Sequence, residues 1–239
     1  MVTLSSRDNS VLRSILNPDE STSGNSHISP SLPSLPSCSE SLFTELRDEE
    51  ISILRTLDNG DADSDTIKRV ISSLSSLIQK APYYASAYIN RAQARRLLLP
   101  LDDLFAQENF MTCEEVFEDL RKGVALAAPV SASQMCSEHQ ASVLAAGYTH
   151  RGTLLFKAAD MVEKDLIDGS AGRYLRASSA DELEELASKD FAAGARFGSE
   201  VAQKMSLKTN PYAKMCGAVV KEALRKDIEE AGGTTFNMY

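Results

Sequence analysis

Apolar residues recur at helical spacing along most of the chain, and no stretch alternates between apolar and polar residues as a half-buried strand would. In the first clear example, Val70, Leu74 and Leu77 fall on one face, and Pro82 ends that stretch soon afterwards. The same pattern continues, helix after helix, to about residue 231. We therefore expect an all-α protein without a sheet.

Two local signals mark helix starts. Thr112 with Glu115, and Ser179 with Glu182, fit the capping box, in which each side chain bonds a free backbone amide at the start of the helix. Helices are therefore expected to begin at Thr112 and Ser179.

Composition divides the chain into four parts. Residues 1–18 carry apolar residues at helical spacing and predict a short helix. Residues 19–41 are rich in serine and proline, and such a segment buries too little apolar surface to offset its ordering entropy. A disordered linker is expected there. Residues 42–231 hold the folded domain, and residues 232–239 form a tail.

An internal repeat is visible within the helical region. Each copy has an aromatic residue, an arginine and a small residue on a first helix, and small and bulky apolar residues on a second helix. The first-helix residues are Tyr88, Arg91 and Ala92 in one copy and Tyr148, Arg151 and Gly152 in the other. The second-helix residues are Val116, Leu120 and Gly123 in one copy and Ala187, Phe191 and Gly194 in the other. Helix pairs that repeat in this way stack into solenoids.

Two arginines stand where the first helix of a repeat should pack. Arg91 lies at the edge of the expected packing face, and Arg95 lies one turn further along. An arginine can cover apolar surface with its stem while its charged head is bonded or solvated. We interpret both as structural residues.

The repeat resembles the tetratricopeptide repeat, with "YINRAQA" as its first helix. In chain order, "ILNPD", "ASAYINRAQARRL", "HRGTLLFKAAD", "DFAAGARFGS" and "NPYAKMCGAVV" resemble the tetratricopeptide repeat protein 36 family over most of residues 11–225. The resemblance implies an all-α solenoid of about three helix pairs. It also implies a small non-enzymatic adaptor, with association with Hsp70-type chaperones among the implied roles.

Insertions separate the repeats. They are placed at residues 98–111, at residues 130–142 and between residues 159 and 187, and the first helix of the third repeat is expected to run from about Glu138 to about Leu166. In the first insertion, Leu101, Leu104 and Phe105 are either docking residues or packing residues, and packing is the preferred interpretation.

A terminal helix over residues 211–230 is expected to cover the open end of the solenoid, since a stack of repeats otherwise ends in an exposed apolar face. Its start is marked by Asn210 before Pro211. Its apolar face consists of Tyr212, Met215, Cys216, Val219, Ala223 and Ile228.

The first helices of the repeats are expected to line a groove that binds a partner protein. The groove residues predicted in this way are Ser86, Ile89, Asn90, Gln93, Arg96, Thr149, His150, Thr153 and Phe156. Repeats that grip chaperone tails bind two carboxylates with lysine, asparagine and arginine donors, and only Asn90 matches that set. Glu50 stands where a lysine belongs. A surface or helix of a folded partner is therefore the expected ligand, in place of a chaperone tail.

Charge and cysteine content exclude other classes. The formal net charge of −9 disfavours nucleic-acid binding, and no apolar run approaches the roughly 20 residues that cross a bilayer. The four cysteines form no CxxC pair, which suggests free thiols in a reducing compartment. We expect a cytosolic protein with passive access to the nucleus.

Catalysis and cofactor binding have little support. Cys136 and His139 are spaced so that they could share a metal, and Cys136 with His150 could pair as nucleophile and base, but neither set is complete. No glycine-rich phosphate loop is present. A non-enzymatic protein without cofactor or metal is expected, and a structural subunit that docks through its insertions is the alternative. Ser29 before Pro30 is either a phosphorylation site or part of an unmodified linker.

Overall fold

The computed structural model of the chain describes residues 28–36, 38–57, 62–131, 134–167, 179–210 and 219–226. Its labelled α-helices are α2 (Glu40–Leu54), α3 (Ser64–Lys80), α4 (Ala85–Leu97), α5 (Phe110–Ala127), α6 (Glu138–Glu163), α7 (Ala180–Arg196) and α8 (Glu200–Thr209). Within these ranges the only β pairing is an isolated parallel bridge between Ile28 and Cys136. The all-α prediction is confirmed.

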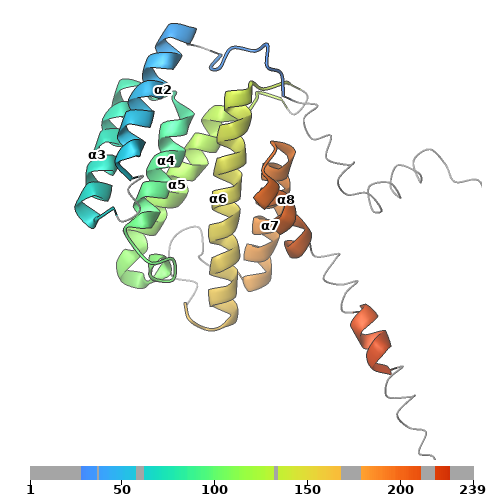
Figure 1. Ribbon diagram of the computed structural model, residues 1–239. Helices are drawn as coiled ribbons and strands as arrows, with labels where there is room; N and C mark the ends of the chain where they lie inside the picture. Colours follow the sequence, from blue (N-terminus) through green and yellow to red (C-terminus); the bar gives the residue numbers. More distant parts are fainter. Residues whose placement is uncertain are drawn as a thin grey trace, which may run out of the picture.

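The helices pack in chain order. They cross the molecule from α2 and α3 on one side to α7 and α8 on the other, and each helix contacts the next (Figure 1). Helix α4 also contacts α6, and α6 contacts α8, so the first helices of successive pairs lie side by side. Buried apolar residues form one cluster centred on α2, α3 and α4 and a second that extends from α4 to α8.

Helix starts agree with the sequence in one case and differ in another. Ser179 and Glu182 form the predicted capping box at the start of α7. Thr112 does not start α5, because the 3-10 turn Gln107–Asn109 leads directly into a helix that begins at Phe110. The chain therefore enters α5 from a preceding turn and needs no serine or threonine cap. The long first helix of the third repeat is confirmed as α6.

Small residues let the helices approach closely, as the repeat predicts. A Cβ atom added at Gly123 would lie 2.5 Å from Cδ1 of Ile89, and one added at Gly152 would lie 3.1 Å from two ring atoms of Phe191. Real Cβ atoms rarely come this near to other atoms, so both glycines sit where no larger residue fits without movement.

The first insertion packs onto the repeats. It forms the 3-10 turns Asp103–Phe105 and Gln107–Asn109, and the side chains of Leu104 and Phe105 are fully buried in the α4–α8 cluster. The packing interpretation of these residues is confirmed, and they offer no docking surface.

The sequence predicts a disordered linker over residues 19–41, but the described part of that segment lies against the helices. Leu35 is buried in the α2–α4 cluster. The backbone amide of Ser29 donates to the carbonyl of Cys136 at 2.9 Å, and the Ser137 hydroxyl donates to the carbonyl of Ser34 at 3.0 Å. We call residues 28–36 together with Cys38 and Ser39 the strap. The linker prediction is wrong there. It rests on the average composition of the segment, which does not reveal that one buried leucine and a few hydrogen bonds hold the strap in place. Residues 19–27 and the helix predicted within residues 1–18 lie outside the described residues.

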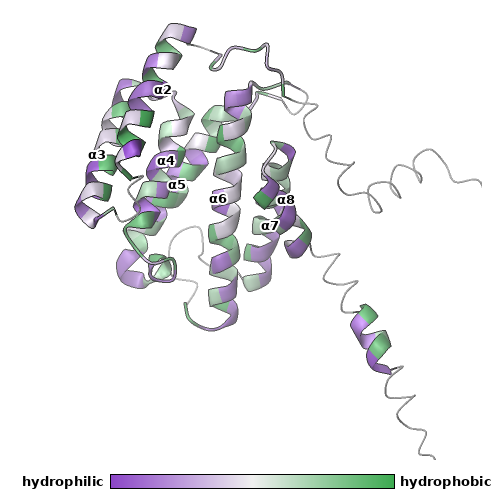
Figure 2. Ribbon diagram, viewed as in Figure 1, coloured by the Kyte–Doolittle hydropathy of each residue, from purple (hydrophilic) through white to green (hydrophobic). Residues whose placement is uncertain are grey.

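The predicted capping helix is also corrected. Residues 219–226 are helical, but all of them are exposed, including the apolar Val219 and Leu224, and Figure 2 shows apolar and polar residues together on this isolated turn of helix. They cover no apolar face, and the rest of the predicted helix 211–230 lies outside the described residues. Helix α8 instead packs on α7, after a tight turn in which Gly198 has a φ of +93°.

Replacing Gly152 by leucine should destabilise the protein because the new side chain meets Phe191 and the carbonyl of Ala187. The expected loss is about 1–3 kcal/mol or more in the free energy of unfolding, measured by chemical denaturation. Ala192→Leu, at an exposed position on α7, is the control and should change it by less than about 0.5 kcal/mol. Equal losses in the two variants would contradict the close approach of α6 and α7.

Candidate functional site

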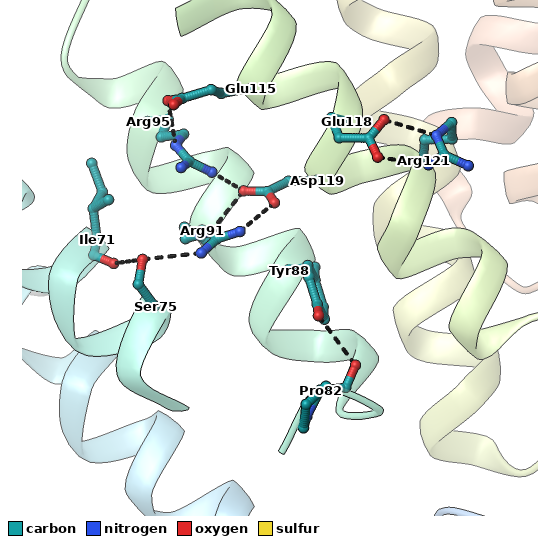
Figure 3. A network of polar contacts seen from close by, with 10 residues as sticks. All are labelled: Ile71, Ser75, Pro82, Tyr88, Arg91, Arg95, Glu115, Glu118, Asp119 and Arg121. Atoms are coloured by element: carbon teal, nitrogen blue, oxygen red, sulfur yellow. Dashed lines mark hydrogen bonds and ion pairs between the residues drawn. The ribbon is translucent and has the colours of Figure 1, made fainter. Parts of the chain in front are cut away.

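A buried ion cluster joins α4 to α5 and explains the two arginines. Arg91 is bidentate to Asp119, with Nε donating to Oδ2 at 2.9 Å and Nη2 to Oδ1 at 2.6 Å (Figure 3). Its Nη1 also donates to the Ser75 hydroxyl of α3 at 3.0 Å. Arg95 contacts the same carboxylate and pairs with Glu115 at 3.1 Å. The structural interpretation of Arg91 and Arg95 is confirmed.

The third repeat contains a copy of this pair. Arg151 donates to both oxygens of Asp190 at 2.7 Å, and its guanidinium lies 5.5 Å from the ring centroid of Tyr148. In the second repeat, Arg91 lies 5.7 Å from the ring of Tyr88. The tyrosine and arginine of the sequence repeat therefore form one unit with a carboxylate of the second helix.

Sequence reasoning missed the carboxylate of that unit. Asp119 precedes Leu120 and Asp190 precedes Phe191, so the aspartate stands at the same place in both copies of the repeat. A repeat comparison that includes polar positions finds it.

A second buried carboxylate binds two of the predicted groove residues. Glu50 of α2 accepts hydrogen bonds from the hydroxyl of Ser86 at 2.9 Å, the amide of Asn90 at 2.8 Å and the hydroxyl of Tyr84 at 2.7 Å. Burial raises the pKa of Glu50, and the three hydrogen bonds oppose that rise. The polar groups of Ser86 and Asn90 thus hold α2 against α4.

Ile89 does not belong to a partner surface. It is 2% exposed, and its side chain fills the space above Gly123 of α5 and Gly147 of α6. Its assignment to the groove is wrong because it lies on the side of α4 that faces both neighbouring helices.

Gln93 and Thr153 are exposed, and they occupy the same position in the two repeats. On α4, Gln93 follows Asn90, which contacts α2, and precedes Arg96, whose charge acts on His150 of α6. On α6, His150 and Thr149 lie one turn before Thr153. The Thr149 hydroxyl hydrogen-bonds the Ser199 hydroxyl at the start of α8 at 2.8 Å. Both residues therefore point outward between neighbouring first helices.

The remaining predicted groove residues lie next to these two. Burial, together with the charge of Arg96, lowers the pKa of His150 to about 4, and Nδ1 of His150 has no hydrogen-bond partner among the described residues. Phe156 is partly buried against the core, and the ammonium of Lys208 lies 5.5 Å from its ring centroid. We call Gln93, Arg96, Thr153, Phe156 and Lys208 the first-helix face.

Two other titratable residues that the sequence singles out, His139 and Cys136, are buried. His139 lies edge-on to Phe43 with ring centroids 4.8 Å apart and stacks on Tyr84 at 6.0 Å, and burial lowers its pKa. Cys136 is buried beside the strap, and burial raises the pKa of its thiol. Across the described residues, no three histidine, cysteine or acidic side chains converge as metal ligands, and no helix is long and apolar enough to span a bilayer.

The chain matches a fungal protein over nearly its whole length. It is 40% identical over 242 residues to the L-tyrosine degradation gene cluster protein hmgX of Aspergillus fumigatus, and the match covers 95% of this chain and 94% of that protein. The chain belongs to the hmgX family. No family profile matches the chain, and no solved structure resembles it at a significant level.

Asp119→Asn should destabilise the protein strongly, because it leaves the buried guanidinium of Arg91 without a charged partner and leaves Arg95 with only the half-exposed Glu115. The expected loss is about 3–5 kcal/mol in the free energy of unfolding. Asp190→Asn should cost less because, among the described residues, Asp190 pairs with one arginine, Arg151, whose side chain is 24% exposed. A smaller loss for Asp119→Asn than for Asp190→Asn in urea denaturation would contradict the shared-carboxylate arrangement.

His150 should make stability fall at low pH. Its folded pKa of about 4 lies below the ordinary value of 6.5, so the unfolded chain binds a proton that the folded chain refuses between those pH values. This contribution is complete above pH 6.5 and is lost as the pH falls to 4, by up to about 3 kcal/mol. The raised pKa of Glu50 has the opposite effect: its contribution to the free energy of unfolding is lost as the pH rises above 4.5. His150→Leu should therefore flatten the decline below pH 6.5, and an unchanged slope would contradict the burial of His150.

Proposed function

We propose that this chain is a non-enzymatic adaptor that binds a partner protein through its first-helix face in L-tyrosine degradation. The observation that carries the proposal is the pair Gln93 and Thr153, which are exposed at the same repeat position on helices that lie side by side. The setting is taken from the name of the A. fumigatus relative.

The proposed fold type is a tetratricopeptide-repeat solenoid of the tetratricopeptide repeat protein 36 type. Successive antiparallel pairs, with α4 beside α6 and α6 beside α8, support this assignment. Glycines at the contacts within the pairs support it too, because they allow the close helix approach that the repeat requires. In such a stack the first helices share one continuous surface, which suits an extended or helical ligand.

The proposed partner is an enzyme of L-tyrosine degradation, since proteins whose genes cluster with a pathway commonly act on its enzymes. The chaperone tail is the less favoured ligand. Its carboxylates would need Asn90, and the Asn90 amide already donates to Glu50. An Hsp70-type chaperone that presents a folded surface stays compatible with the proposal.

The absence of catalysis is also proposed. Both described histidines have lowered pKa values because they are buried, and both face aromatic or apolar neighbours or another cation. A general base needs an orienting group and access to substrate, and neither histidine has a carboxylate partner among the described residues. Purified protein incubated with tyrosine-derived acids, esters and phosphates should release no product.

Gln93→Arg with Thr153→Arg should abolish capture of the partner while leaving the fold intact, because both positions are exposed and helical. The measurement is a pull-down of each purified L-tyrosine degradation enzyme by the full-length chain, with melting temperature as the folding check.

The matched control is Ala125→Arg with Ala192→Arg, which adds the same two charges to exposed positions on the second helices α5 and α7. If the control variant loses capture and the first-helix variant captures normally, the partner binds on the second helices, and the proposed face is wrong.

A further inference from the structure

We propose that the cationic part of the first-helix face, from Arg96 to Lys208, binds acidic side chains within a folded or helical segment of the partner, not a free carboxyl terminus. This inference rests on the proposed function and adds the chemistry of the ligand.

A path across three helices runs from Arg96 past His150, Thr153 and Phe156 to Lys208. Arg96 of α4 lies close enough to His150 of α6 for its charge to lower the pKa of that imidazole. Thr153 is one turn beyond His150, and Phe156 is one turn beyond Thr153. The ammonium of Lys208 on α8 lies over the Phe156 ring at 5.5 Å. A ligand that crosses Thr153 therefore passes between two cations.

Both cations are available to a ligand. Arg96 and Lys208 have no ion-pair partner among the described residues, whereas most other described arginines and lysines of the helices are paired, as Arg151 is with Asp190 and Lys157 with Asp102. Arg96 and Lys208 thus place two cations without an ion-pair partner among the described residues on one face of a chain whose formal net charge is −9. Opposite charge on the partner would raise both the rate and the specificity of association.

A free carboxyl terminus is excluded by the charge arrangement beside this face. The position where a terminal carboxylate would meet Asn90 holds the carboxylate of Glu50, which takes the hydrogen bonds of Asn90, Ser86 and Tyr84. A second carboxylate at this place would lie against the first in a buried setting, which is unfavourable. The Glu50 carboxylate thus occupies the place that a terminal carboxylate of the partner would take. The two cations that bind the partner, Arg96 and Lys208, lie nearer to α8.

The first-helix face also offers apolar surface to a ligand. Leu97 is 45% exposed and lies one turn beyond Gln93 on α4, and the Phe156 ring is partly exposed on α6. A ligand that carries leucine or similar side chains between its acidic residues fills this surface and pairs with both cations. An amphipathic acidic helix has this composition.

The test uses a helical peptide with glutamates one turn apart and leucines between them, acetylated and amidated so that it has no terminal charge. Its binding to the full-length chain is followed by fluorescence anisotropy. We expect binding that weakens at least about tenfold when Arg96→Gln is combined with Lys208→Gln, and that also weakens between about 50 and 300 mM salt. A peptide with glutamine in place of glutamate should bind no better to the wild type than to the variant.

The matched control is Lys122→Gln with Arg196→Gln. It removes the same charge, and Lys122 lies over the Tyr88 ring at 5.0 Å much as Lys208 lies over Phe156. The control should bind the peptide within about twofold of the wild type, since both charges are exposed on the second helices α5 and α7 and lie outside the first-helix face.

Three results would overturn the inference. They are equal binding by the wild type and the Arg96/Lys208 variant, stronger binding of the same peptide when its carboxyl terminus is free, and displacement of the peptide by a single-stranded oligonucleotide at equal concentration. The inference can fail while the proposed function stands. If the Arg96/Lys208 variant still captures an L-tyrosine degradation enzyme and the Gln93/Thr153 variant does not, the face stands and its acidic ligand is wrong.

Discussion

A guanidinium placed between two packed helices has to meet a carboxylate there, because an unpaired charge in a buried site is far more costly than a paired one. In this chain the requirement is met twice, by Arg91 with Asp119 and by Arg151 with Asp190, each beside a tyrosine ring. The bidentate geometry fixes the rotation of the first helix against the second. Which residues of α4 and α6 then point outward follows from these two contacts.

The arginine–aspartate contacts therefore determine both how the two helices of a pair pack and which residues of the first helices are exposed. Gly123 and Gly152 let the helices close, and the arginines fix their rotation. Glu50 performs a related task between pairs, because its three hydrogen bonds join α2 to α4. These buried polar side chains set the orientation of the helices, and the first-helix face lies between α4, α6 and α8.

Helical class, repeat and close contacts were predictable because each leaves a periodic trace in the sequence. The tyrosine and arginine recur at equal spacing within the first helix, and the bulky apolar residue and glycine recur at equal spacing within the second, although the insertions change the distance between the two helices. Bonds between distant residues leave no such trace. The hydrogen bonds from Ser86 and Asn90 to Glu50 depend on how two helices meet, so both residues look like free groove residues in the sequence. The sequence also assigns Ile89 to the groove, because a shift of one residue along the helix is enough to turn an exposed position into one that contacts Gly147. The strap was missed for a different reason: composition averages over a segment, whereas Leu35 and a few backbone bonds decide its place.

The strap changes how the molecule is connected. In a simple stack, each repeat touches only its neighbours, so an end unit can detach and the remainder stays folded. Here Leu35 is buried with the first helix pair, and Ser34 bonds Ser137 at the start of α6, which belongs to the third. This contact spans a long stretch of sequence and closes a loop around the second pair. Loss of the first pair therefore releases a tether on the third, and the array gains a cooperativity between non-adjacent units that nearest-neighbour stacking alone does not provide.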